Sequence, residues 1–163
     1  AEGGGEMIEH VSFEKTTYNV LPYKFEAGTP NYVGSYAFSK AIDYIEDIGL
    51  EDITNHEHAL AEYLETQLVS LSNVRVYAAG KEKAGAISFN VYRADGTLIH
   101  PFDVGVLLDR QGVAVRTGHH CAEPLIDYLD VPGTVRASVG LYNTKEDINE
   151  FIAALKKAIM MLE

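Results

Sequence analysis

The most regular hydrophobic pattern in the chain covers residues 145–162, near its C-terminal end. Apolar residues recur there at spacings of 4, 3, 4 and 3, the period of one helix face, at Ile148, Ile152, Leu155, Ile159 and Leu162. The preceding residues, Thr144-Lys145-Glu146-Asp147, resemble a capping box with Asp in the acidic position. The pattern therefore predicts an amphipathic helix that begins after Thr144 and packs one face against a core.

Three further segments show helical spacing. Residues 32–48 carry periodic apolar positions, and Gly49 follows them as a stop signal. A second, longer helix is predicted from Ile53 to Leu71, where leucines line one face. A short helix is predicted over residues 103–111, because Gly112 stands just past its end, where a left-handed residue commonly closes a helix.

Alternating and β-branched residues predict strands in the rest of the chain. Residues 7–20 indicate a hairpin of short strands. Single strands are predicted at residues 74–77, 86–91, 113–115 and 134–139, with residues 80–85 as a turn. No repeat, low-complexity tract or linker separates these elements. We therefore predict an α+β fold in which helices pack on a small mixed sheet.

Composition and charge narrow the class of protein. A chain of 163 residues is long enough for one domain with a real core. The net charge of -11, without a Lys/Arg cluster, argues against nucleic acid as a partner. No apolar run approaches the roughly 20 residues of a membrane span, so we expect no membrane segment. One cysteine and no signal-peptide pattern favour the cytoplasm.

The strongest candidate for chemistry is the hexapeptide Arg116-Thr117-Gly118-His119-His120-Cys121, which ends in the only cysteine. A guanidinium and two imidazoles near a thiol favour its thiolate, the form that acts as a nucleophile or metal ligand. A lone cysteine is more commonly a small buried hydrophobe, but the polar residues around this one are not typical of a core.

Two other chemistries remain open for the same hexapeptide. His119, His120 and Cys121 are zinc ligand types, and His56 and His58 add more, although three contiguous residues cannot easily face one ion. A cysteine hydrolase would use His119 or His120 as a base, yet adjacent residues rarely reach that orientation without a third group.

Two polar segments suggest anion binding. Gly28-Thr29-Pro30-Asn31 precedes a predicted helix, where a hydroxyl and free N–H groups form an anion pocket; plain N-capping explains the same residues. In Thr134-Val135-Arg136-Ala137-Ser138, Arg136 lies on the strand face opposite its apolar neighbours, and Ser138 shares that face. A guanidinium there is suited to a bidentate grip on a carboxylate; a surface arginine is the alternative.

Taken in order, six segments of the chain resemble the C-terminal part of a group II, SufS-type cysteine desulfurase of the class V aminotransferase family. They are Gly3-Gly4-Gly5-Glu6-Met7-Ile8, residues 25–31, residues 103–109, residues 116–125, Arg136-Ala137-Ser138 and Tyr142-Asn143-Thr144. The block Arg116 to Leu125 is the most specific, because group I enzymes carry a serine-rich cysteine loop instead. The resemblance covers the whole chain.

The resemblance implies the small C-terminal domain of a fold-type I enzyme that uses pyridoxal 5'-phosphate (PLP). Such enzymes convert L-cysteine to L-alanine and hold the sulfur as a persulfide, here on Cys121 as the catalytic nucleophile. Arg136 matches the arginine that grips the substrate carboxylate, and Arg116 and His119 line the same substrate pocket. Thr29 matches the threonine that binds the cofactor phosphate of the partner subunit. No residue is assigned to a metal.

The resemblance also implies partners. These are L-cysteine or selenocysteine as substrate, a second copy in a homodimer, and a SufE- or SufU-like acceptor that passes sulfur to iron–sulfur cluster assembly. A non-catalytic α+β domain that binds an anion or a metal is the alternative from another class.

One departure from the family limits the expected activity. The lysine that binds PLP lies upstream of the glycine block in the family, and none of Lys15, Lys24, Lys40 and Lys81 stands in that motif. We therefore read the chain as a fragment that binds PLP poorly and turns over no cysteine by itself. Residues 1–31 are expected to be a remnant of the large cofactor domain and dimer interface. Residues 32–163 are expected to form the small domain with its bridging helix.

Overall fold

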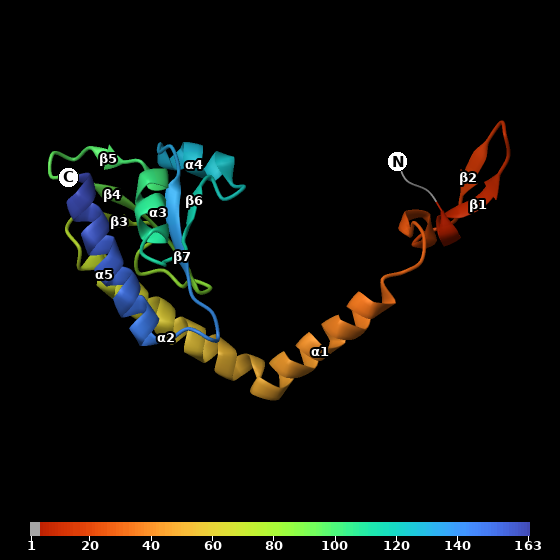
Figure 1. Cartoon of the computed structure of the whole chain (residues 1–163), viewed down its shortest axis with the longest axis horizontal. Helices are drawn as coiled ribbons and strands as arrows, with labels where there is room; N and C mark the ends of the chain where they lie inside the picture. Colours follow the sequence, from red (N-terminus) through yellow and green to blue (C-terminus); the bar gives the residue numbers. More distant parts are fainter. Residues whose placement is uncertain (1–3) are drawn as a thin grey trace. The chain divides into compact units, whose positions relative to one another are not determined.

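The computed structural model describes residues 4–163, which form two compact units (Figure 1). The N-terminal unit ends at Gly49, and the C-terminal unit runs from Leu50 to Glu163. The division falls after the helix over residues 32–48, later than the boundary expected at residue 31. That helix therefore groups with the N-terminal segment. Gly3 of the glycine block lies outside the described residues, as do Ala1 and Glu2.

The N-terminal unit confirms the predicted hairpin and helix. Its elements are η1 (Gly5–Met7), β1 (Ile8–Val11), β2 (Thr16–Tyr18), η2 (Tyr23–Phe25) and α1 (Tyr32–Ile48). The two strands pair antiparallel. None of the residues of α1 is buried, and Phe38, with 67% of its surface exposed, shows how open its apolar positions are. The helical periodicity of α1 thus meets no packing surface within this unit.

The C-terminal unit contains the rest of the secondary structure. Its elements are α2 (Leu50–Val69), β3 (Val74–Val76), β4 (Ala86–Tyr92), β5 (Leu98–Ile99), α3 (Pro101–Asp109), β6 (Arg116–Gly118), α4 (Glu123–Leu129), β7 (Thr134–Ser138) and α5 (Lys145–Leu162). The capping box at the start of α5 is present as predicted, with Thr144 and Asp147 each bonding the other's backbone N–H. Among the described residues, no helix is both long and apolar enough to cross a membrane.

The sheet of the C-terminal unit has the order β3-β4-β7-β6, with β5 beside β4. The α+β class is confirmed, but each pairing in this sheet is antiparallel, whereas we expected a mixed sheet. The cause is connectivity: short turns reverse the chain between β3 and β4 and between β4 and β5. The chain also returns antiparallel after α4, which lies between β6 and β7 in sequence. Hydrophobic alternation alone carries no information about that direction.

Two elements differ from the sequence prediction. Residues 113–115 are not a strand; the strand is β6, which begins at Arg116. Helix α4 follows the cysteine directly and was not predicted, because it is short and leaves Leu125 and Tyr128 exposed. The predicted helix at residues 103–111 is confirmed as α3, and Gly112 beyond it has a left-handed φ of 80°.

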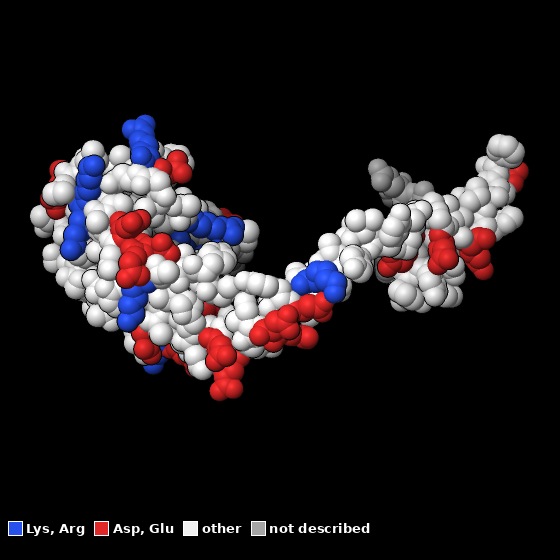
Figure 2. Space-filling model, turned by 60° about the horizontal axis from the view of Figure 1, so that its bottom comes forward, with Lys and Arg blue, Asp and Glu red and all other residues white. Residues whose placement is uncertain are grey.

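Charged side chains are interspersed on the face of the C-terminal unit shown in Figure 2. The Lys and Arg atoms there form separate patches rather than a continuous stripe. The sequence has 24 acidic and 13 basic residues, so no large basic surface is expected.

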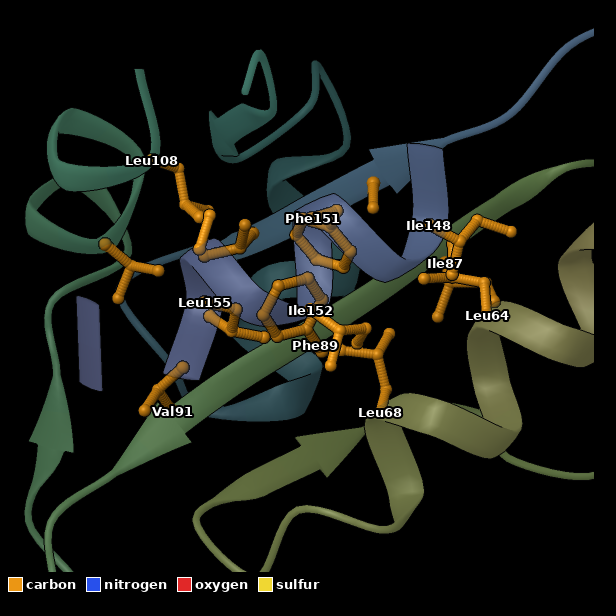
Figure 3. Packing of buried hydrophobic residues seen from close by; sticks show 14 of the residues in the cluster. Leu64, Leu68, Ile87, Phe89, Val91, Leu108, Ile148, Phe151, Ile152 and Leu155 are labelled. Carbon is orange, nitrogen blue, oxygen red and sulfur yellow. The ribbon is translucent and has the colours of Figure 1, made fainter. Parts of the chain in front are cut away.

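The two faces of the sheet have different side chains. On one face, Ile87, Phe89 and Val91 of β4 and Val135 of β7 are fully buried against α2, α3 and α5. The rings of Phe89 and Phe151 meet edge to face, with centroids 6.1 Å apart (Figure 3). The alternate residues point to the opposite face, and the polar ones among them are Ser88 and Asn90 of β4 and Thr134, Arg136 and Ser138 of β7. The helices thus cover the apolar face, and the candidate chemistry lies on the other one.

Candidate active site

The cysteine loop connects β6 to α4 on the polar side of the sheet. His120 and Cys121 have φ values of 56° and 59°, so two successive residues with side chains adopt the left-handed conformation. This conformation costs about 1–2 kcal/mol for each such residue, and contacts elsewhere must hold it. The resulting turn leaves Cys121 exposed as a free thiol. Cys121 is therefore accessible, rather than a small buried hydrophobe.

Arg116 is the charged group that contacts the cysteine. Its Nη2 donates a hydrogen bond to Cys121 Sγ over 3.5 Å. A guanidinium at this distance interacts more favourably with a thiolate than with a thiol. Arg116 is the first residue of β6, and Cys121 lies in the turn at the other end of the loop. The strand therefore fixes the backbone from which the arginine side chain reaches the sulfur.

Arg136 lies directly opposite Arg116 in the sheet. The register pairs Arg136 of β7 with Arg116 on one side and with Ser88 of β4 on the other. The prediction that Arg136 occupies the face opposite Val135 and Ala137 is thus confirmed, since both of those residues are in the core. Arg136 Nε is buried and has no hydrogen-bond partner within the described residues.

The pairing of two arginines has an electrostatic consequence. Like charges in directly opposed positions of neighbouring strands repel each other, and a buried N–H without a partner costs free energy. An anion that accepts hydrogen bonds from both guanidinium groups would remove both penalties. The Arg116–Arg136 pair is therefore suited to hold a carboxylate close to the sulfur of Cys121.

His120 points into the protein rather than towards solvent. Its Nε2 lies 3.1 Å from Thr134 O and 2.9 Å from Thr134 Oγ1. Burial lowers the pKa of His120 below its ordinary value of 6.5, and the charges of Arg136, Arg116 and His119 lower it further, against an opposing effect of the Thr134 backbone. His120 is thus neutral at physiological pH.

His119 is exposed at the start of the loop. Its Nδ1 is 3.9 Å from Glu123 Oε1, and the two side chains are 50% and 72% exposed. Such a pair contributes little to stability. The structure places His119 in the same loop as Cys121 but gives it no partner that fixes its ring.

Thr29 lies in the N-terminal unit, in the exposed loop before α1. The helix cap there is Asn31, whose Oδ1 accepts a hydrogen bond of 2.9 Å from Gly34 N. N-capping by this segment is therefore confirmed, with Asn31 rather than Thr29 as the cap residue. The Thr29 hydroxyl makes no hydrogen bond within the described residues and is free to bind a phosphate oxygen.

The described residues contain no ligand set that would support a metal site. Among residues 4–163, no group of three His, Cys, Asp or Glu side chains is arranged to hold an ion. His56, one of the proposed additions, instead has its Nε2 3.0 Å from Asn143 O.

Sequence reasoning missed two buried polar residues behind the loop. Asn90 is fully buried and donates hydrogen bonds of 3.0 Å to Gly133 O and to the hydroxyl of Tyr77. Thr134 is 1% exposed and contacts His120. The available signal was a polar residue that alternates with the core positions of each strand, and such a residue requires a partner when it is buried.

The lysines of the chain do not provide an anchor for a carbonyl cofactor. Lys83 alone has a largely buried side chain, and it pairs with Glu65 and also donates to Ala78 O and Lys81 O. All three of its protons are thus engaged, and the other lysines are exposed. Lys83 also lines a cavity of about 690 Å³ along α2, and Cys121 is not among the lining residues of that cavity. The guanidinium groups of Arg116 and Arg136 have the chemistry to hold an anionic substrate, whereas a covalent anchor is not found among the described lysines.

Comparison with known proteins decides the family. The family model described as aminotransferase class-V matches residues 1–151. The chain belongs to this family. Members of the class-V aminotransferase family use PLP.

Relatives within the class-V family carry a common name. The chain is 48% identical over 156 residues to a protein named "Probable cysteine desulfurase" from Halalkalibacterium halodurans, covering 96% of this chain and 37% of the relative. It resembles the crystal structure of the cysteine desulfurase CsdA (S-sulfonic acid) from Escherichia coli, with a TM-score of 0.83 and 34% identity over 99% of this chain and 39% of that one.

A second solved structure agrees. The apo cysteine desulfurase from Thermococcus onnurineus NA1 matches with a TM-score of 0.81 and 38% identity, over 99% of this chain and 39% of that chain. The chain thus spans less than two-fifths of the length of the relatives it matches. The expected fold, part of a fold-type I PLP enzyme, is confirmed.

Proposed function

We propose that this chain is the cysteine-bearing part of a PLP-dependent cysteine desulfurase that converts L-cysteine to L-alanine. Cys121 carries the transferred sulfur as a persulfide. The observation that carries the proposal is the exposed Cys121 held on Arg116, directly beside the unpartnered guanidinium of Arg136. The names of the class-V relatives support the reaction class.

Each residue of the site has a defined task. Arg136, with its free Nε, binds the substrate carboxylate and orients the amino acid. Arg116 favours the thiolate of Cys121, which attacks the substrate sulfur. A sulfur–sulfur bond forms, the carbon–sulfur bond of the substrate breaks, and its electron pair stays with the substrate carbon, which is protonated to give alanine. The sum, cysteine plus thiol giving alanine plus persulfide, is balanced without an outside oxidant.

The cofactor is shared with residues beyond those described. PLP, when bound, withdraws electrons from the substrate Cα and so makes the carbon–sulfur bond labile. In this chain Thr29 would bind its phosphate, in trans within a homodimer. Since no lysine here is placed to anchor PLP, we infer that the 163-residue chain alone does not turn over cysteine.

The finer assignments rest on the motif around Cys121. We infer a group II, SufS-type enzyme that supplies iron–sulfur cluster assembly through a SufE- or SufU-like acceptor in the cytoplasm and that also accepts selenocysteine. The exposure of Cys121 supports delivery of sulfur to a second protein, because an acceptor thiol can reach it. The division into residues 1–31 of the cofactor domain and 32–163 of the small domain stays a prediction.

The test is an assay of the holoenzyme that carries this chain. Purified protein with PLP and L-cysteine is analysed for alanine by amino-acid analysis and for one added sulfur atom on Cys121 by mass spectrometry. Cys121→Ser is expected to lose the added sulfur and most alanine formation, and Arg136→Gln is expected to raise KM for cysteine. Alanine formation that survives Cys121→Ser unchanged would contradict the role of Cys121. Stoichiometric metal without alanine formation would favour the non-catalytic binding domain.

A further inference from the structure

The cysteine loop rests on a row of buried polar contacts behind it. Asn90 of β4 donates to Gly133 O, which precedes β7, and the next residue, Thr134, contacts His120 in the loop. The backbones of Gly133 and Gly118 approach so closely that a Cβ on Gly133 would lie 3.0 Å from Gly118 Cα. The start of β7 is thus held firmly from β4, and the loop is attached to it through His120.

The contacts of His120 define which of its ring nitrogens carries the proton. A carbonyl oxygen can only accept a hydrogen bond, so the 3.1 Å approach of Nε2 to Thr134 O requires a hydrogen on Nε2. His120 Nδ1 is buried and has no partner among the described residues. A proton on Nδ1 would therefore be a buried donor without an acceptor, and the Nε2-protonated neutral ring is the state that these contacts permit.

The surroundings oppose a positive charge on this ring. The positive charges of Arg136 on β7 and Arg116 on β6 act on this ring, and His119 precedes it in the loop. Glu123 of α4, the nearby acidic group, lies beside His119 instead. A protonated His120 would thus be a cation beside two guanidinium groups, without a carboxylate partner of its own.

We propose that neutral His120 is a positioning residue that holds the Cys121 loop in its left-handed conformation by donating Nε2–H to Thr134. With the bond in place, Cys121 Sγ stays within reach of Arg116; when it is lost, the two left-handed residues relax and the sulfur leaves the guanidinium. His120 therefore acts on the sulfur through geometry. It is not a base for the thiol, because Nε2 is engaged and Nδ1 is buried.

This proposal rests on Cys121 being the reacting group, but its test needs no turnover. The rate of alkylation of Cys121 by iodoacetamide is measured on the full 163-residue chain from about pH 5 to 9, where the single cysteine makes the signal unambiguous. His120→Leu is expected to slow the reaction at neutral pH about tenfold, the effect of one hydrogen bond. His120→Gln, whose amide N–H reaches about as far as Nε2, is expected to restore most of the rate.

Two further variants and a folding control separate positioning from general destabilisation. His58→Leu is the matched control, because His58 lies on α2 and lines the separate cavity; it is expected to keep the wild-type profile. Thr134→Val removes Oγ1 but keeps the carbonyl, so a smaller loss of alkylation rate than that of His120→Leu is expected. Near-ultraviolet circular dichroism establishes that each variant is folded.

A spectroscopic readout needs no variant. Nitrogen-15 chemical shifts of the His120 ring in the wild-type chain are expected to show hydrogen on Nε2 and none on Nδ1. The Nδ1-protonated tautomer, or a folded His120→Leu with an unchanged alkylation profile, would overturn the proposal. If these results hold while the holoenzyme forms no alanine, the proposed function fails and the positioning role of His120 stands.

Discussion

Helices α1 and α5 both show hydrophobic periodicity, yet they lie in opposite environments. Helix α5 buries seven residues, including Phe151 and Leu155, whereas α1 buries none within the described residues. Periodicity specifies that a segment is helical and which face is apolar, but not which surface covers it. The comparison teaches that the C-terminal unit contains its own core, while the N-terminal unit presents an apolar face without one.

Replacing a core aromatic ring is the strongest way to test this comparison. Phe89→Ala is expected to lower the free energy of unfolding of the C-terminal unit by about 3–5 kcal/mol, because it leaves a cavity between the sheet and Phe151. Phe38→Ala on α1 is the matched change and is expected to cost less than about 0.5 kcal/mol, since that ring is exposed. Urea denaturation followed by circular dichroism measures both. Equal losses would mean that α1 is packed in solution.

Ion pairs offer a second contrast between the units. Lys83→Met removes the partner of Glu65, whose side chain is only 18% exposed, and is expected to cost on the order of 3 kcal/mol. Lys40→Met breaks the pair with Asp43 on α1, where the side chains are 61% and 54% exposed, and is expected to change stability by less than about 0.5 kcal/mol. Thermal unfolding of the two variants provides the comparison. A small effect of Lys83→Met would show that the turn before β4 is not held by this pair.

Helix caps provide a third, smaller contrast. Thr144→Ala removes the capping box of α5 and is expected to lower the stability of the C-terminal unit by about 1 kcal/mol. Asn31→Ala removes the cap of α1 and is expected to reduce helix content without lowering the unfolding midpoint of the C-terminal unit. Far-ultraviolet circular dichroism during a urea titration separates the two. A shifted C-terminal midpoint in Asn31→Ala would contradict the independence of the units.

Among these changes, lowering the pH is expected to have the smallest effect per site on the free energy of unfolding. Burial alone would raise the pKa of Glu65, but hydrogen bonds from Lys83 and from Gly80 N–H, with the charge of Lys83, together lower it below 4.5. A carboxyl group with a lowered pKa stabilises the fold above its unfolded pKa, and this contribution is lost as pH falls through the folded value. The stability of the C-terminal unit should therefore decline below about pH 4.5, and Glu65→Gln should flatten part of that slope. An unchanged slope in Glu65→Gln, measured by urea titrations at several pH values, would remove Glu65 as the cause.

The sequence allowed prediction of much of the fold but little of the site geometry. The long helices were predictable because leucine and isoleucine positions repeat over many turns, and the face of Arg136 followed from the alternation with Val135 and Ala137. Strand β6 was misplaced by three residues, because its pairing with β7 rather than its own hydrophobicity defines it. The strand directions were wrong for a related reason, since they depend on the connections.

The geometry of the candidate site could not be predicted without the tertiary contacts. That Cys121 contacts Arg116 depends on a left-handed turn at two residues with side chains, for which the sequence shows no glycine at either position. The contact between His120 and Thr134 joins residues 14 positions apart through that same turn. Local propensity disfavours such a loop, so only the packing that enforces it reveals which groups meet.

The alternation along β7 also limits how this chain can change over evolutionary time. Thr134, Arg136 and Ser138 face the chemistry, whereas Val135 and Ala137 face the core, so the two sets of residues can be exchanged almost independently. A point mutation at Arg136 or Ser138 changes the polar face without changing the core residues. Inserting one residue ahead of the strand would do the reverse, because it would turn the guanidinium into the hydrophobic interior and the valine towards the sulfur. Substitutions on the polar face can therefore change the specificity of this unit, whereas an insertion or deletion before β7 would disrupt its fold.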